Sequence, residues 1–363
     1  MLFCCPSISY CQSLEEYETA AEKGDANAQA ILGSLYIRGN VVEKNYEIGA
    51  RWLKKAAEQG NALGQYGMGW LYYQGYGVVQ NYTESVKWYM KAAAQGHVDA
   101  QSDLAVCYEQ GLGVTKNYTE ALHWFKKAAE QGSAYAQYCV GDYYKDGTGV
   151  HVNYKEAAKW YRLSANQGYS AAQVKLGDIY YLGYGEAKNF NEAYRWYMKA
   201  AEQGNVDGQF DVGDCYRYGY GVEVNYVEAS KWYKKAADQG NAGAKTALGM
   251  LYCNGSGVSQ DYEKAFLYFM DAARQGYPAA QNNVGVCYKK GLGVAQNIYE
   301  AFKWYQKSAA LGNPEGLFNV GYCYYYGEGV VENVQEGIKW LTAAAQKGNI
   351  NAQRFLRQLN KQW

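Results

Sequence analysis

Residues 120–150 have the sequence EALHWFKKAAEQGSAYAQYCVGDYYKDGTGV, and this pattern recurs along most of the 363-residue chain. Its central glycine, Gly132, has counterparts spaced 36 residues apart, without an insertion or deletion. The series is Gly24, Gly60, Gly96, Gly132, Gly168, Gly204, Gly240, Gly276, Gly312 and Gly348. With each glycine counted as repeat position 0, position 8 is always apolar, position 12 is tyrosine nine times, and position 28 is tryptophan eight times in nine. Self-similarity at a fixed period is the signature of a repeat architecture.

Each unit contains the start and stop signals of two helices. A polar residue at position 1, such as Ser133, can cap the free amides of the first helix. The glycine at position 15, such as Gly147, supplies a left-handed residue that ends this helix. The second helix opens on an asparagine followed three residues later by glutamate, as in Asn117 and Glu120, which is a capping-box arrangement. It ends at the next position-0 glycine.

A single pair of short helices cannot bury its apolar face, whereas stacked pairs can, with each pair contacting mainly its neighbours. We therefore predict an all-α fold, an α/α superhelical solenoid of 36-residue helical hairpins. The aromatic residues at positions 22, 28 and 29 are expected to form its core. The predicted organisation is an N-terminal tail (1–13), a capping helix (14–23), nine repeats (24–347) and a C-terminal capping helix (348–363). Glu16 and Asn360 place polar groups at aromatic repeat positions, as terminal caps require.

The composition excludes several classes of protein. The chain has 35 Lys plus Arg and 35 Asp plus Glu, so it lacks the cationic excess of a nucleic-acid binder. With 48% hydrophobic and 19% charged residues it is too apolar to be disordered. No run of about 18 apolar residues is present, so no transmembrane segment is predicted.

The cysteines and the N-terminus bear on location. Nine cysteines at irregular spacing and three histidines match neither a disulfide framework nor a zinc site. Free thiols in a reducing compartment are expected. The start, MLFCCPSISYC, is a poor signal peptide, so a cytoplasmic location is expected. Export, delivery to a host cell, and lipidation of Cys4 or Cys5 are left open.

The pattern WYxKAAxQGxxxAQxxLGxxYxxGxGVxxNYxEA resembles the Sel1-like repeat, a relative of the tetratricopeptide repeat, over about nine-tenths of the chain. The resemblance implies an α/α solenoid that acts as a scaffold or adaptor for protein partners. For a bacterium living in contact with host cells, it also implies a host protein as a target. Val41, Glu186, Tyr268 and Asp271 depart from the pattern, which leaves the local loop shape open.

A partner surface is predicted from the tetratricopeptide pattern, in which first helices line the concave side. Repeat positions 6, 7, 10, 13 and 14 are expected there. These positions hold aromatic residues early (Tyr66, Trp70, Tyr73), acidic residues in the middle (Asp103, Asp142, Asp146, Asp178, Asp211, Asp214) and aromatic residues late (Phe318, Tyr322, Tyr325, Tyr326). Our hypothesis is an acidic groove that binds a basic or extended protein segment, with aromatic anchors at each end. The alternative is that these are solvated residues and packing aromatics.

Catalysis is not expected. The three histidines are scattered, and the GxG loops never extend to GxGxxG after a strand, so we assign no catalytic, cofactor or metal residue. Two alternatives to a scaffold stay open: a carbohydrate-binding solenoid and a regulatory subunit that activates a separate enzyme. Rings of Trp70, Tyr73, Tyr322 and Tyr325 that lie flat and open would favour a sugar, whereas rings packed into side pockets would favour a peptide.

Overall fold

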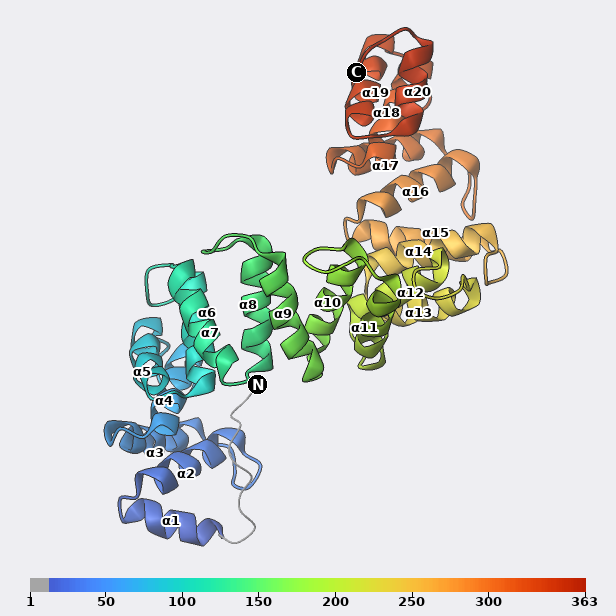
Figure 1. The fold of residues 1–363 in the computed structure, drawn as a ribbon. Helices are drawn as coiled ribbons and strands as arrows, with labels where there is room; N and C mark the ends of the chain where they lie inside the picture. The colour runs from blue at the N-terminus through green and yellow to red at the C-terminus, as the bar shows by residue number, and fades with distance from the viewer. Residues whose placement is uncertain (1–12) are drawn as a thin grey trace. The chain divides into compact units, whose positions relative to one another are not determined.

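The computed structural model describes residues 13–363, and all regular structure in this range is helical (Figure 1). The first helices of the repeats are α2 (Ala26–Arg38), α4 (Ala62–Gln74), α6 (Val98–Gln110), α8 (Ala134–Asp146), α10 (Ser170–Leu182), α12 (Val206–Tyr218), α14 (Ala242–Asn254), α16 (Pro278–Lys290), α18 (Pro314–Tyr326) and α20 (Ile350–Gln358). The second helices are α1 (Leu14–Glu22), α3 (Tyr46–Glu58), α5 (Tyr82–Ala94), α7 (Tyr118–Glu130), α9 (Tyr154–Asn166), α11 (Phe190–Glu202), α13 (Tyr226–Asp238), α15 (Tyr262–Arg274), α17 (Ile298–Ala310) and α19 (Val334–Gln346). The predicted all-α solenoid is confirmed.

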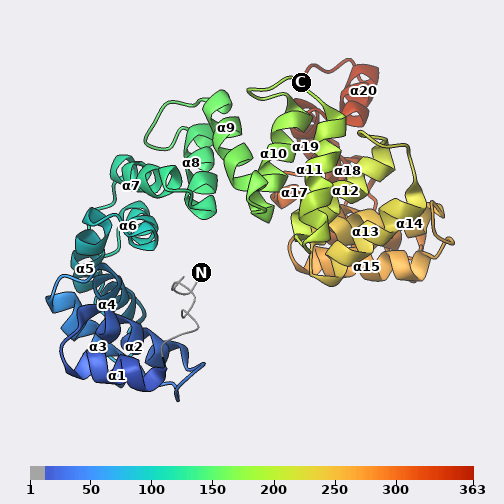
Figure 2. The same cartoon turned by 60° about the horizontal axis from the view of Figure 1, so that its bottom comes forward.

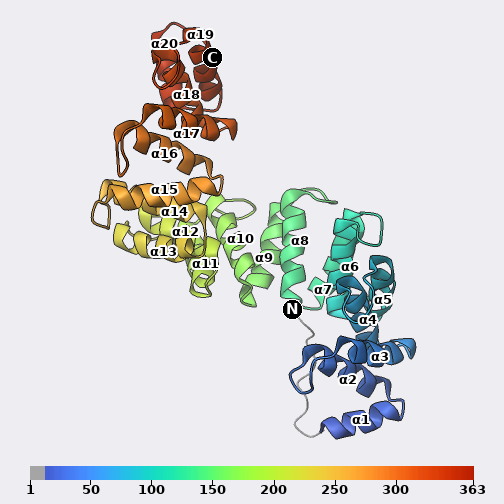
Figure 3. The ribbon, with the colours of Figure 1, turned by 180° about the vertical axis from the view of Figure 1, so that it is seen from behind.

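Two compact units make up the chain. Unit 1 runs to Ile179 and includes Gly183–Ala187, and unit 2 comprises Tyr180–Leu182 and Lys188–Trp363. Within each unit the hairpins follow one another in chain order, from α2–α3 to α8–α9 and from α12–α13 to α18–α19 (Figures 2 and 3). First helices of successive repeats contact each other, as α2 does α4 and α16 does α18, and we call this side of each unit its inner face. Helices α1 and α20 pack against α2 and α19, and their role as caps stays a prediction.

The helix ends follow the sequence signals with one change. The Ser133 hydroxyl accepts from the Ala136 amide at 3.2 Å, and Gly147 ends α8 at a φ of 71°. Asn117 caps α7 by accepting from the Glu120 amide at 3.2 Å. The expected reciprocal bond of the capping box is replaced, because the Asn117 amide donates to the Tyr108 carbonyl at 2.9 Å. The asparagine thus ties the second helix to the end of the first.

Burial separates the three aromatic positions that were expected to form the core. Position 29 is fully buried, as Tyr161 shows, and its ring lies so close to Gly141 that a Cβ there would be 2.5 Å from it. At position 28 the tryptophans are half-buried. In six of the eight, a lysine three residues later covers the ring; the Lys235 ammonium, for example, lies 3.6 Å from the centre of the Trp232 ring. Position 22 lies near the surface, where Tyr118 is 38% exposed.

Paired glutamines join three successive helices. Gln101, at position 5 on α6, donates to the Ala93 carbonyl in the last turn of α5 at 3.2 Å. Gln131, at position 35 at the end of α7, donates to the Gln101 side-chain oxygen at 2.8 Å. The Ala93 carbonyl also accepts from the Gly96 amide at 3.0 Å, so Gln101 gives this carbonyl a second hydrogen bond at the helix end. The repeat of Gln281 is different, because its position 35 is Leu311 and the buried Gln281 Oε1 has no hydrogen-bond partner.

Departures from the repeat pattern are accommodated locally. Glu186 accepts from the Arg162 guanidinium at 2.5 Å, which anchors that loop to α9. Asp271 pairs with Lys245 at 2.6 Å, and this lysine occupies position 5, where other repeats have glutamine. Val41 is 48% exposed in the loop of the first repeat.

Candidate partner-binding surface

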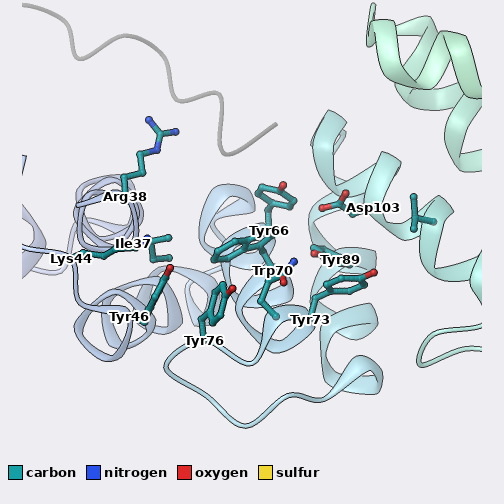
Figure 4. Close-up of a pocket in the computed structure, with 12 residues that line it drawn as sticks. Ile37, Arg38, Lys44, Tyr46, Tyr66, Trp70, Tyr73, Tyr76, Tyr89 and Asp103 are labelled. Atoms are coloured by element: carbon teal, nitrogen blue, oxygen red, sulfur yellow. The ribbon is translucent and has the colours of Figure 1, made fainter. Parts of the chain in front are cut away.

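The inner face of unit 1 carries two adjoining hollows. The first has a volume of about 580 Å³ and lies among α2, α4 and α6 (Figure 4). Its walls are the aromatic side chains Tyr46, Tyr66, Trp70, Tyr73, Tyr76 and Tyr89, with Asp103 at one end and Arg38 and Lys44 at the other. The second has a volume of about 650 Å³ and reaches from α4 and α6 to the starts of α8 and α10. Tyr66, Asp103 and Val106 line both, so the hollows form one continuous surface.

The three early aromatic residues of the hypothesis all lie in the first hollow. Tyr66 is buried, with 3% of its surface exposed, so position 6 contributes to the core here as well as to the surface. Trp70 is half-buried, with its ring 5.6 Å from that of Tyr76. Tyr73 is half-buried and meets Tyr82 edge-on at 5.2 Å.

Asp103 lies beside these rings, so the structure brings together aromatic and acidic groups that the sequence hypothesis kept apart (Figure 4). The hydroxyls of Tyr66 and Tyr89 hydrogen-bond to its carboxylate. Burial and the negative charge of Asp99, opposed by the two tyrosine hydrogen bonds, together raise the pKa of Asp103 to about 6. A carboxyl group that is only partly ionised near pH 6 therefore sits where the hollows meet.

The remaining acidic residues expected in the middle of unit 1 lie outside both hollows. The Asp142 carboxylate accepts from the Tyr161 hydroxyl at 2.6 Å. Asp146 is exposed, and its carboxylate lies 3.3 Å from the Lys145 ammonium. The Asp178 carboxylate lies 4.0 Å from the Lys175 ammonium. Asp142 thus helps to hold a buried tyrosine of the second helix, so position 10 takes part in packing.

Unit 2 holds the other predicted residues. Asp211 and Asp214 are half-buried on α12, and Asp214 accepts from the Tyr233 hydroxyl, as Asp142 does from its tyrosine. Burial raises the pKa of Asp214, while Tyr233 and Arg217 lower it. Neither aspartate lies beside the late aromatic residues, which belong to α18.

Those late residues form one aromatic cluster. Tyr322 contacts the rings of Phe318 and Tyr326 at 6.1 and 4.6 Å, and Tyr325 meets Phe355 of α20 edge-on at 5.2 Å. The Lys289 ammonium lies 4.6 Å from the centre of the Tyr322 ring. Phe355 completes the cluster, although the sequence hypothesis did not include it.

Several lining residues of unit 1 were also missed from the sequence. Asp99 and Tyr135 lie at repeat position 3, to which the sequence analysis assigned no role, and Tyr169 lies at position 1, which it interpreted as a capping position. Tyr76 comes from the loop after α4 and reaches into the first hollow. At position 1, Tyr169 departs from the small polar residue that most repeats have there, and this departure is a signal that could have found it. Position 3 varies between repeats and gives no such signal.

Among residues 13–363, no three metal-ligating side chains come together. Within the described helices, none has both the length and the apolar character needed to cross a bilayer. Cys4 and Cys5, for which lipidation was left open, lie outside the described residues.

Comparison with known protein families identifies the family of the chain. The family model of the Sel1 repeat matches nine consecutive segments: 26–61, 62–97, 98–133, 134–169, 170–205, 206–241, 242–277, 278–313 and 314–349. The chain belongs to the Sel1 repeat family. Sel1 repeat solenoids generally act as scaffolds that bind other proteins, and the family is typically non-enzymatic.

Solved structures agree with this assignment. One is c5321, a protective antigen present in uropathogenic Escherichia coli strains, which displays an SLR fold. Its sequence is 33% identical and its structure matches with a TM-score of 0.73, and the match covers 94% of this Sel1 chain and 81% of c5321. Another is a Sel1 repeat protein from Oxalobacter formigenes, 29% identical with a TM-score of 0.65, over 87% of this chain and 97% of that one. No curated protein matches the chain.

Proposed function

We propose that this Sel1 repeat protein is a non-enzymatic scaffold that holds an extended, basic segment of another protein along the inner face of unit 1. The observation that carries the proposal is the pair of hollows that meet at Tyr66, Asp103 and Val106. Together they run across the first helices of several successive repeats, which suits an extended chain. Aromatic walls around a carboxylate offer both apolar contact and charge to such a segment.

The packing of the inner-face aromatic residues favours a peptide over a sugar. Stacking on a sugar ring requires an aromatic face that lies open to solvent. Trp70 and Tyr73 instead pack against Tyr76 and Tyr82, and each is half-buried. Tyr322 and Tyr325 likewise pack within the aromatic cluster of α18 and α20.

The test is quantitative affinity capture with the full chain, from lysates of the source organism and, where it lives in contact with host cells, of the host. Wild type is compared with Trp70→Ala, which removes a wall of the first hollow. The matched control is Tyr118→Ala, an aromatic residue on second helix α7 of the same unit, outside both hollows. We expect proteins that wild type and Tyr118→Ala retain and that Trp70→Ala loses.

Two results would favour the other functions. Quenching of tryptophan fluorescence by oligosaccharides but not by peptides from the captured proteins would make the chain a carbohydrate-binding solenoid. A captured enzyme whose turnover rises when the chain is added would make it a regulatory subunit. Capture that is the same for wild type and Trp70→Ala would refute the inner face of unit 1 as the binding surface.

We further propose that the protein works in the cytoplasm. The described cysteines, from Cys107 to Cys323, are free thiols, and burial raises the pKa of Cys107 to about 12, which keeps it protonated and unreactive. Fractionation of cells that carry a C-terminally tagged chain would test this. Recovery in a membrane or secreted fraction would refute it.

A further inference from the structure

The second hollow of unit 1 has an unusual combination of charge and aromatic surface. Asp99 and Asp103 lie four residues apart on α6, which places both on the same side of the helix and in the wall of the hollow. No lysine or arginine lines this hollow, and within the described chain neither carboxylate forms an ion pair. Arg38 and Lys44 lie in the first hollow, at the end away from Asp103 (Figure 4).

Among residues 13–363, the titratable groups next to these two carboxylates supply no positive charge at pH 7. His97 stacks on Tyr66 at 4.5 Å, and burial lowers its pKa, so it is neutral at pH 7. The other described titratable groups around Asp103, besides Asp99, are Tyr66, Tyr73, Tyr89 and Cys107, and burial raises the pKa of each. The hydroxyls of Tyr66 and Tyr89 occupy only part of the acceptor capacity of Asp103. A carboxylate has about four acceptor sites, so the remaining sites can accept from a bound cation.

Aromatic rings form the rest of the wall. Tyr66 stands on the α4 side, and Tyr135 and Tyr169 stand at the starts of α8 and α10. Tyr135 is 37% exposed and is held edge-on by Phe125 at 6.1 Å, and Tyr169 packs against Tyr138 at 5.4 Å. A cation near a tyrosine face is attracted to the ring, and the attraction is stronger where the cation is desolvated.

We propose that the hollow lined by Asp99, Asp103 and these tyrosines binds the cationic head of an arginine or lysine side chain from the partner segment. The proposal rests on the proposed function, and it names the residue that anchors the segment. The side chain enters between the rings of Tyr66, Tyr135 and Tyr169. Its head pairs with the two carboxylates and supplies the positive charge that no described residue lining the hollow provides.

The probe is a random twelve-residue peptide library displayed against the immobilised full chain. Enriched peptides are labelled with fluorescein and their affinities are measured by fluorescence polarisation. We expect the enriched sequences to share an arginine or lysine, and its replacement by citrulline or norleucine to lower the affinity about tenfold. Citrulline keeps the shape of arginine and removes its charge.

A double-mutant cycle identifies the protein side of the pair. Asp99→Asn should weaken the arginine peptide about threefold to tenfold and leave the citrulline peptide unchanged. The matched control is Asp207→Asn, which removes an acidic residue at the same repeat position on α12 of unit 2. This control should leave both affinities unchanged. Circular dichroism checks that each variant is folded, and Asp103→Asn provides a second variant.

The outcomes separate the two proposals. Peptides that require Trp70 but contain no necessary cation, or whose citrulline and arginine forms bind equally well, would overturn the cation site and leave the scaffold in place. Peptides that bind Trp70→Ala and Asp99→Asn with the same affinity as wild type would place binding elsewhere and overturn both proposals. A library from which no peptide is enriched would also overturn both proposals.

Discussion

Substitution of Leu311 by glutamine should stabilise the protein. Among the described glutamines at position 5, only Gln281 has a buried side-chain oxygen without a hydrogen-bond partner, and a glutamine at position 311 would donate to it. In other repeats the position-35 glutamine donates to the position-5 glutamine, as Gln95 does to Gln65 at 2.8 Å and Gln239 to Gln209 at 2.9 Å. Gln281 still donates to the Ala273 carbonyl at 3.4 Å, but its own oxygen accepts no hydrogen bond. Leu311 is 56% exposed, so its removal sacrifices little buried apolar area.

The magnitude follows from three contributions. Satisfying a buried acceptor recovers about 1–3 kcal/mol of desolvation penalty. Ordering a glutamine side chain at the surface costs up to about 1.5–2 kcal/mol, and the lost contacts of a half-exposed leucine are small. We expect Leu311→Gln to stabilise the repeat by about 1 kcal/mol. Gln95→Leu, the reverse change, should destabilise its own repeat by about 1–2 kcal/mol because it leaves the Gln65 oxygen without a donor.

Local measurement is required because stacked repeats unfold in parts. Hydrogen exchange followed by mass spectrometry should show slower exchange in peptides from residues 278–313 of Leu311→Gln, and faster exchange around residues 62–97 of Gln95→Leu. Urea unfolding provides the global counterpart. If Leu311→Gln left exchange unchanged while Gln95→Leu accelerated it, the hydrogen bond would matter but the Gln281 oxygen would have another partner. If neither variant changed, the glutamine pairs would contribute nothing to stability.

Two further perturbations test the loops and the buried acid. Gly113→Ala should destabilise the protein by more than about 3 kcal/mol, because the φ of Gly113 is +71° and an added Cβ would overlap the Tyr82 carbonyl oxygen. Gly132→Ala should cost only about 1–2 kcal/mol, because the φ of Gly132 is +95° but an added Cβ there would lie in open space. Equal losses of unfolding free energy in urea would contradict this. Asp103 binds its proton more tightly when the protein is folded, because its pKa is then about 6, so wild type should lose about 1–3 kcal/mol of stability relative to Asp103→Asn as the pH rises from 4 to 7.5. The control Asp207→Asn retains Asp103 and should lose stability over this pH range as wild type does.

Much of the fold could be predicted from local signals. The caps at Ser133 and Asn117 and the left-handed Gly147 form within a few residues of each other, so their geometry depends on local chemistry. The capping box was only half right, because the Asn117 amide found a better partner, the Tyr108 carbonyl, nine residues away. Such a bond depends on how the loop closes, which sequence spacing does not report.

The candidate site was harder to predict, for a related reason. Asp142 and Asp103 belong to the same acidic group in the sequence, yet Asp142 supports a buried tyrosine while Asp103 lines two hollows. Tyr76, Tyr135 and Tyr169 reach the hollows from a loop and from helix starts. Which side chains converge depends on the packing of neighbouring repeats, and positions within one repeat carry no information about that.

The amino-acid sequence by itself determined the architecture of this protein: a period of 36 residues, two helices in each period, and helix ends set by capping residues and glycines. Only the tertiary structure decided which of the aromatic and acidic side chains face a hollow and which support the core. The physical reason is that helix formation and capping act over a few residues. The shape and charge of a groove arise instead from side chains of four or five different helices, brought together by stacking.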